Sequence, residues 1–179
     1  MSFEMIPYVE RNGVRTFSDN YMKDLYERCV DEGHAETVFY EGTVRTADDF
    51  VTALKKSICW VVAKDDVALA VVWLTRHEGR FARFHFIIFE DCLRKEIRKL
   101  GRFALNSILH MTTRSGEFCY DLLLGYIPVR NKGAINYVLK SGAHFVGEIP
   151  NGAWIAREGT SEPVMVVSVT RESLYENLH

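Results

Sequence analysis

Five positively charged side chains are crowded into the nine residues from Arg94 to Arg102, and Glu96 is the only acidic residue among them. Such a cluster can hold phosphate groups, because lysine offers a point charge and arginine offers a planar fork of donors. The same charges would equally suit the solvated face of a helix. The sequence leaves both interpretations open.

Other common chemistries have no matching pattern. The motifs Gly-x-Ser-x-Gly, His-Glu-x-x-His and Walker A are missing, which removes support for a hydrolase, a zinc protease or a nucleoside triphosphatase. We expect no metal site, because His34, His77 and His110 have no partner at metal-ligand spacing. The net charge of −2, and the alternation that places Phe84 and Phe86 on one strand face, argue against a nucleic-acid partner.

Two helices are predicted before any long strand. Ser18 is a suitable N-cap for the first helix, whose apolar residues recur at helical spacing until Gly33. Thr46, with Asp49 three residues later, predicts the start of the second. The apolar ranges 58–63, 67–74 and 81–89, separated by short polar turns, then predict an antiparallel meander of three strands.

The second half of the chain alternates helices and strands. Apolar residues at helical spacing from Leu93 to Met111 predict a long helix, and the apolar run 120–127 predicts a strand covered on both faces. A helix over 131–140 and strands over 144–149, 154–156 and 164–170 follow, with Asn151-Gly152 as a hairpin turn. We therefore expect one α/β domain over residues 1–179, with helices on both faces of a mixed, mostly antiparallel sheet.

One segment carries a family resemblance. Ile127-Pro-Val-Arg-Asn-Lys-Gly-Ala-Ile135 precedes Lys140-Ser-Gly-Ala-His-Phe-Val-Gly147. This segment resembles the N-x-x-A-x-x-x-x-x-K-x-G-F-x-x-x-G pattern that follows the fifth strand of the GNAT superfamily of acyl-CoA-dependent N-acyltransferases. The element order is similar to that of a GNAT domain, and the flanking Ile-Pro pairs resemble GNAT-like proteins of bacteriophage and prophage genomes.

The resemblance implies acetyl-CoA as the acyl donor. In the family, two central parallel strands, here 81–89 and 120–127, splay apart and admit the pantetheine arm as though it were an added strand. The resemblance places Asn131 and Ala134 beside that arm, although Asn131 can equally be a simple helix cap and Ala134 a packing residue. The strand residues implied to contact the arm are Ile87, Ile88 and Phe89.

The pyrophosphate loop of the family follows the pattern Gln/Arg-x-x-Gly-x-Gly/Ala at a helix start, where free N–H groups receive phosphates. Here Arg98 and Gly101 match, but Phe103 replaces a small residue and Ala104 comes one position late. A helix that ran straight through Gly101 would leave no free N–H groups there. The cofactor-binding residues implied in this region are Arg94, Arg98, Gly101, Arg102, Phe103 and Ala104.

Acyl transfer to an amine needs a base for the amine, a donor for the carbonyl oxygen and an acid for the departing thiolate. The resemblance implies the backbone N–H of Ile88 or Phe89 as the donor. It suggests Glu90, its neighbour Asp91, or His85 as the base. The family's acid is commonly a tyrosine at the position of Val138. The candidates here are Tyr137, which is also implied to touch the cofactor, and Tyr126. Each candidate could equally be structural.

The sequence thus predicts an acetyl-CoA-dependent N-acetyltransferase that acetylates an amine of a small molecule or a protein. The altered pyrophosphate stretch leaves open an alternative, a non-catalytic GNAT-like binding module or phage-associated structural protein. Either would be a monomer or a homodimer without a nucleic-acid or membrane partner.

We predict a cytoplasmic location. The four cysteines lie too far apart for a zinc motif, and the start of the sequence lacks the features of a signal peptide. Apolar runs such as 67–74 are too short to span a bilayer.

Overall fold

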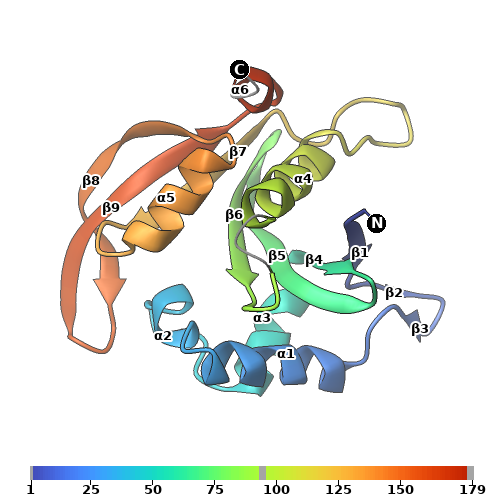
Figure 1. Cartoon of the computed structure of the whole chain (residues 1–179), viewed down its shortest axis with the longest axis horizontal. Coiled ribbons are helices and arrows are strands. Elements are labelled where there is room, and N and C mark those ends of the chain that lie inside the picture. Colours follow the sequence, from blue (N-terminus) through green and yellow to red (C-terminus); the bar gives the residue numbers. More distant parts are fainter. Residues whose placement is uncertain (1, 93–95, 177–179) are drawn as a thin grey trace. The chain divides into compact units, whose positions relative to one another are not determined.

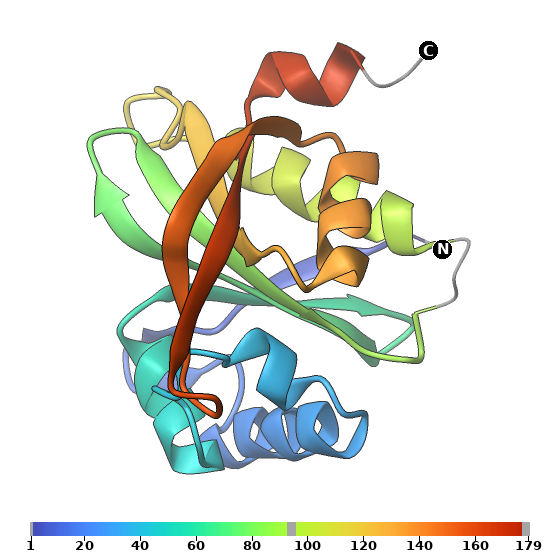
Figure 2. The ribbon, with the colours of Figure 1, turned by 90° about the vertical axis from the view of Figure 1, so that its left-hand side faces the viewer.

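The computed structural model describes residues 2–92 and 96–176 of the 179-residue chain (Figures 1 and 2). Its strands are β1 Glu4–Pro7, β2 Glu10–Arg11, β3 Val14–Arg15, β4 Ile58–Lys64, β5 Val67–Glu78, β6 Phe81–Ile88, β7 Leu122–Pro128, β8 His144–Ile155 and β9 Thr160–Val169. Its helices are α1 Asp19–Asp31, α2 Ala35–Val38, α3 Ala47–Lys55, α4 Ile97–Leu109, α5 Lys132–Lys140 and α6 Arg171–Glu176.

Seven strands form one sheet in the order β1-β4-β5-β6-β7-β9-β8, and β2 pairs with β3 in a separate ribbon. The pairs β1–β4, β4–β5 and β7–β9 are antiparallel, whereas β6 and β7 run parallel through the partners Phe81↔Leu122 and Arg83↔Leu124. Helix α4 connects the two parallel strands, as a crossover between parallel neighbours requires. The mixed, mostly antiparallel sheet with a central parallel pair is therefore confirmed. The divergence of β6 and β7 at their C-terminal ends stays a prediction.

The chain divides into two compact units. Unit 1 comprises Met1–Leu74, His85–Cys92 and Trp154–Thr160. Unit 2 comprises Thr75–Phe84, Leu93–Ala153 and Ser161–His179. The single domain expected over residues 1–179 stays a prediction.

Local sequence signals in unit 1 behave as predicted. The Ser18 side chain accepts a hydrogen bond from the Tyr21 N–H at the start of α1, and Thr46 and Asp49 form a reciprocal capping box at the start of α3. The turn between β4 and β5 consists of Asp65 and Asp66, both with positive φ (53° and 64°), which is the backbone of a tight type I′ hairpin.

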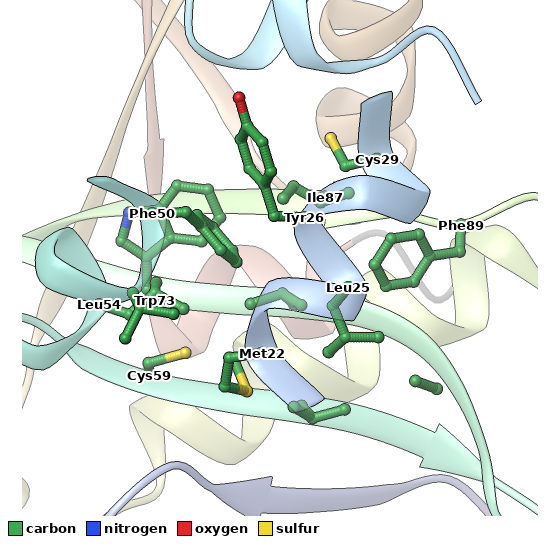
Figure 3. Close-up of a cluster of buried hydrophobic side chains, with 14 residues drawn as sticks. Met22, Leu25, Tyr26, Cys29, Phe50, Leu54, Cys59, Trp73, Ile87 and Phe89 are labelled. Carbon is green, nitrogen blue, oxygen red and sulfur yellow. The ribbon is translucent and has the colours of Figure 1, made fainter. Parts of the chain in front are cut away.

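Helices α1 and α3 close the core of unit 1 (Figure 3). Tyr26, Phe50 and Trp73 are buried in this core. The ring centroids are 5.6 Å apart for Tyr26 and Phe50 and 6.2 Å apart for Phe50 and Trp73. Successive residues of β4, such as Val61 and Val62, are both fully buried, so this strand is covered on both faces. No disulfide joins the four cysteines, all of which lie in the described part of the chain, and burial raises the pKa of the Cys29 thiol to about 12.

Asp19, the first residue of α1, ties the N-terminal segment to α1 and α3. Its carboxylate accepts hydrogen bonds from the Tyr8 hydroxyl at 2.6 Å, from Arg15 Nη1 at 2.7 Å and from Lys55 Nζ at 2.5 Å. The bond from Lys55, followed by that from Tyr8, holds the pKa of Asp19 well below its usual range. Burial, together with the bond to Asp19, raises the pKa of Tyr8.

We expect Asp19→Asn to lower the melting temperature near neutral pH and to lose that effect in acid. Because folding depresses the pKa of Asp19, its contribution is present above the unfolded value of about 3.9 and is lost as the pH falls below it. The difference in melting temperature between the two proteins should therefore stay constant from about pH 7 to about pH 4 and shrink from there to pH 2. A constant difference across the whole range would show that the ionised carboxylate contributes nothing.

Unit 2 departs from the predictions at two places. Strand β8 runs without interruption from His144 to Ile155, so the expected hairpin turn at Asn151-Gly152 is wrong. Asn151 has a φ of 55°, and a Cβ on Gly152 would lie 2.4 Å from the Val164 side chain. The two residues are thus an irregularity within a strand that passes close to β9. The described part of the long helix begins at Ile97, while Leu93 lies outside the described residues.

Candidate active site

The end of β6 offers one backbone donor from unit 1. The N–H of Phe89 donates to the carbonyl oxygen of Leu69 on β5 at 2.9 Å. Because backbone N–H groups point alternately to the two sides of a strand, the N–H of Ile88 points away from β5. The N–H of Phe89 is therefore engaged within the sheet, and Ile88 stays the predicted oxyanion donor. The Ile87 side chain belongs to the buried core of unit 1.

His85 lies in a stack of aromatic rings. Its imidazole is stacked on Trp73 with centroids 5.2 Å apart and ring planes 10° apart, and Phe39 stacks on Trp73 at 6.3 Å. His85 itself is half-buried, whereas Trp73 is buried. The stack fixes the plane of the imidazole.

Glu90, the second candidate base, is exposed and is held by a residue that the sequence did not reveal. The Glu90 N–H donates to Glu32 Oε2 at 2.9 Å, and Arg28 Nε donates to Glu32 Oε1 at 2.7 Å. Arg28 also contacts Asp91 at 3.1 Å and lies 4.2 Å above the Phe89 ring. Glu32 is the C-cap of α1, where a negative charge is unfavourable, so these two donors stabilise its carboxylate.

We expect Glu32→Ala to lower the free energy of unfolding by about 1.5–3 kcal/mol, because it leaves the Arg28 guanidinium and the Glu90 N–H without their shared acceptor. Urea unfolding measures this change. The control is Glu27→Ala, an exposed residue of the same helix, which should change stability by less than about 0.5 kcal/mol. Equal effects of the two variants would contradict the role of Glu32.

Tyr126, a candidate acid, lies in unit 2 beside an arginine. The Arg83 guanidinium stands 4.0 Å above the Tyr126 ring, and Arg83 Nε is buried without a hydrogen-bond partner among the described residues. This cation–π contact could not be predicted from the sequence, where Arg83 is simply an arginine among the apolar residues of a strand. Arg83 was therefore missed as part of the site.

Tyr137, the other candidate acid, lies where α5 packs on α4. A Cβ on Gly101 would lie 2.3 Å from the Tyr137 hydroxyl and 2.5 Å from Ser141 Oγ. Gly101 is buried in the fifth position of α4, so the helix runs through the stretch that resembles a pyrophosphate loop. The glycine thus allows close approach of two helices, which Figure 2 shows side by side, and the phosphate-binding role expected for it has no structural support.

The basic cluster forms part of an open pocket on α4. Lys99, Arg102 and Phe103 line this pocket of about 330 Å³ together with Asn106, Leu174 and Tyr175. Arg98 is exposed on the same helix, and Arg102 Nη2 donates to the carbonyl oxygen of Leu174 at 2.6 Å. The C-terminal helix α6 thereby joins the pocket, a participation that no sequence pattern indicated. Ala104 is buried in α4, and Arg94 lies outside the described residues.

Asn131 caps α5 directly after β7. Its Oδ1 accepts the Ala134 N–H at 3.0 Å, which confirms the predicted cap. The cap uses only the side-chain oxygen, so the two Nδ2 hydrogens remain donors for a ligand. Asn131 and Ala134 are both half-buried.

Each unit gathers its own part of the predicted site. Unit 1 places His85, Ile88 and Glu90 on or next to the end of β6, and unit 2 holds the tyrosines, the α4 pocket and the α5 cap. In the described parts of the chain, no group of three or more histidine, cysteine or carboxylate side chains could hold a metal ion. No helix among residues 2–92 and 96–176 is long and apolar enough to cross a membrane, and the cytoplasmic location stays a prediction.

A sheet with one parallel pair, a helical crossover between its two strands and a capped helix after the second strand is the architecture of the GNAT fold. Comparison with solved structures confirms this fold. A spermidine N-acetyltransferase from Vibrio cholerae, solved in complex with CoA and spermine, matches with a TM-score of 0.67 at 14% identity, over 97% of this chain and 98% of that one. A probable GNAT-family acetyltransferase from Chromobacterium violaceum ATCC 12472 matches with a TM-score of 0.69 at 18% identity, over 98% of this chain and 86% of that one.

A third structure, the microcin C7 self-immunity acetyltransferase MccE in complex with acetyl-CoA and AMP, matches with a TM-score of 0.62 at 14% identity, over 86% of this chain and 88% of that one. Neither a protein-family model nor a curated protein sequence matches the chain. These comparisons give no support to the expected similarity to bacteriophage proteins.

Proposed function

We propose that the protein is an N-acetyltransferase that uses acetyl-CoA and acetylates an amine. The observation that carries this proposal is the parallel pair β6–β7 of a GNAT fold, followed directly by the Asn131 cap. The structural neighbours support it, because two of them were solved with CoA or acetyl-CoA. When bound, acetyl-CoA would supply the acetyl thioester.

The residues of unit 1 fit the transfer step. The N–H of Ile88 would donate to the carbonyl oxygen of the thioester, where negative charge develops. Glu90 or His85 would take the proton from the amine, directly or through one water molecule. Glu32 would act as a positioning residue, since it holds the Glu90 backbone.

The residues of unit 2 fit the ends of the cofactor. Arg98 and Lys99 are exposed cations that would hold its phosphates, and the pocket above Phe103 offers an apolar floor beside them. The Asn131 Nδ2 group would donate to the pantetheine arm. Tyr137 or Tyr126 would return a proton to the departing thiolate.

We further propose that the acceptor is a cationic amine. Residues 19–49 contain nine acidic and three basic side chains, a net charge of −6, whereas the rest of the chain contains fifteen acidic and nineteen basic ones, a net charge of +4. A concentrated negative field of this kind attracts polycations and speeds their association. The neighbour from Vibrio cholerae was solved with spermine, an amine of this class.

A direct assay tests the function. The purified protein is mixed with acetyl-CoA and, in turn, spermidine, a lysine-rich peptide and a neutral aromatic amine, and release of the CoA thiol is followed with a thiol reagent. We expect release with spermidine or the peptide, and a loss of at least about 100-fold in kcat for Glu90→Gln if Glu90 is the base. Binding of acetyl-CoA by calorimetry without release for any amine would instead favour the non-catalytic alternative.

We expect Asn131→Ala to weaken acetyl-CoA binding and to lower stability, and Asn131→Ser to weaken binding alone. Serine keeps a capping oxygen but has no amide donor, so its helix should remain stable. Loss of the cap in the alanine variant costs about 1 kcal/mol of stability, and the unpaired ligand group costs about 1–3 kcal/mol of binding. Melting and calorimetry on both variants separate the roles. Normal binding by Asn131→Ser would make Asn131 a cap only.

A further inference from the structure

Strand β8 forms the free edge of the sheet and is exposed to an unusual degree. It is the last strand in the sheet order, and its one neighbour among the described strands is β9 (Figures 1 and 2). Five of the six residues from His144 to Ile149 are exposed. Three of them are apolar, with exposures of 56% for Phe145, 59% for Val146 and 44% for Ile149. Such an edge presents a row of N–H and C=O groups to another strand.

The usable part of this edge is short and has clear limits. Gly142, with a φ of 109°, precedes it, and Ala143 is buried. Pro150 lacks an N–H, and Asn151 has a φ of 55°, so regular pairing ends at Ile149. Since the segment 143–149 has Val146 at its centre, a two-fold axis at this residue would use the whole of it.

We propose that β8 pairs with β8 of a second copy of this chain, antiparallel and with the two-fold axis at Val146. An antiparallel pair of identical strands is self-complementary, as closed two-fold interfaces require. It also removes the exposed edge, which is otherwise a liability. The protein would then be a homodimer whose sheet continues from one copy into the other.

The side chains agree with this register. An axis at Val146 places Val146 opposite its own copy, which buries two exposed apolar side chains against each other. It places His144 opposite Glu148 of the second copy, twice, so that an imidazole N–H meets a carboxylate. On the other face it places Phe145 over Gly147, where a ring can cover the bare backbone of a glycine. Shifting the axis by one residue would lose both the His144–Glu148 and the Phe145–Gly147 pairs.

Cysteine crosslinking tests the register. In a Cys119→Ser background, which removes the one cysteine that is not buried, Val146→Cys should form a disulfide-linked dimer on mild oxidation. Residues opposite each other in an antiparallel pair have Cα atoms about 4.5–5.5 Å apart, within the range of a disulfide. The matched control is Ile149→Cys, whose copies would lie about 20 Å apart. Equal crosslinking of both variants, or of neither, would overturn the proposal.

Charge changes test the pairing without new covalent bonds. Sedimentation equilibrium should show a dimer whose dissociation constant rises at least about tenfold in His144→Glu and in Glu148→Lys. The first variant places two glutamates opposite each other, and the second removes the carboxylate that would accept the His144 N–H. The double variant His144→Glu/Glu148→Lys restores opposite charges and should recover most of the lost affinity. A wild-type chain that stays monomeric across the concentration range, or a double variant no better than the single ones, would overturn the proposal. Melting curves of each variant establish that the monomer fold is intact.

Discussion

Reversing the charges of Arg98 and Lys99 together is expected to weaken acetyl-CoA binding about 100-fold, a change of about 2.7 kcal/mol. The cofactor carries a pyrophosphate and a 3′-phosphate, and both side chains are exposed near the start of α4. The variant Arg98→Glu/Lys99→Glu replaces two attractions by two repulsions. Arg102 is left unchanged, because its bond to the Leu174 carbonyl makes it part of the attachment of α6.

Calorimetry at two salt concentrations makes this prediction specific. The screening length falls from about 10 Å at 0.1 M salt to about 3 Å at 1 M, so wild-type affinity should fall with salt and the variant should respond less. The control Arg76→Glu/Arg114→Glu changes the net charge equally at exposed positions outside α4. If both double variants bind alike, the cluster on α4 is a solvated helix face and the cofactor phosphates lie elsewhere.

Gly101→Ala and Gly133→Ala should change stability in opposite directions. Both glycines lie within helices, where alanine is favoured by about 1 kcal/mol. A Cβ on Gly133 would meet only Asn131 Oδ1, at 3.8 Å, whereas one on Gly101 would lie 2.3 Å from the Tyr137 hydroxyl. We therefore expect Gly133→Ala to be stabilising and Gly101→Ala to be destabilising by about 2 kcal/mol, so that the two differ by about 3 kcal/mol.

Urea unfolding of both variants measures this difference, and a second substitution identifies its cause. Tyr137→Leu removes the hydroxyl and part of the ring, so Gly101→Ala should cost much less in that background. If Gly101→Ala destabilises the Tyr137→Leu variant as much as the wild type, the Tyr137 side chain moves aside without a loss of stability. Another contact would then cause the destabilisation. A stabilising Gly101→Ala would show that the close approach of α4 and α5 is not needed.

The fold could be predicted to a large extent, because its signals are local. The caps at Ser18, Thr46 and Asn131 are all found where the residue types place them, and the apolar strand runs fall in the sheet as expected. The hairpin turn predicted at Asn151-Gly152 was wrong because this residue pair is compatible with a turn and with an irregularity inside a strand. The contact of Gly152 with Val164, on another strand, favours the second. The N-terminal ribbon and α6 are short and gave no periodic signal.

The candidate site was less predictable, because its determinants are contacts between distant parts of the sequence. Phe89 and Ile88 are equivalent in sequence, and the bond from Phe89 to Leu69 is what separates them. Glu32 holds Glu90 from 58 positions away, and Arg83 meets Tyr126 across two strands. Sequence spacing can nominate a glutamate or a tyrosine, but burial and partners decide which of them can carry out chemistry.

The attachment of Glu90 to Glu32 also has a thermodynamic consequence. Glu32 closes the C-terminal end of α1, in the acidic part of the chain, and its carboxylate holds Glu90, the second residue after β6. A ligand that shifts this end of α1 changes the free energy of the hydrogen bond at Glu90. The coupling is reciprocal. If binding of the first ligand changes the affinity for a second ligand that contacts Glu90, then binding of the second changes the affinity for the first by the same factor. If the acceptor binds near α1, as proposed, this half-buried carboxylate would couple it to the strand end proposed for the transfer step.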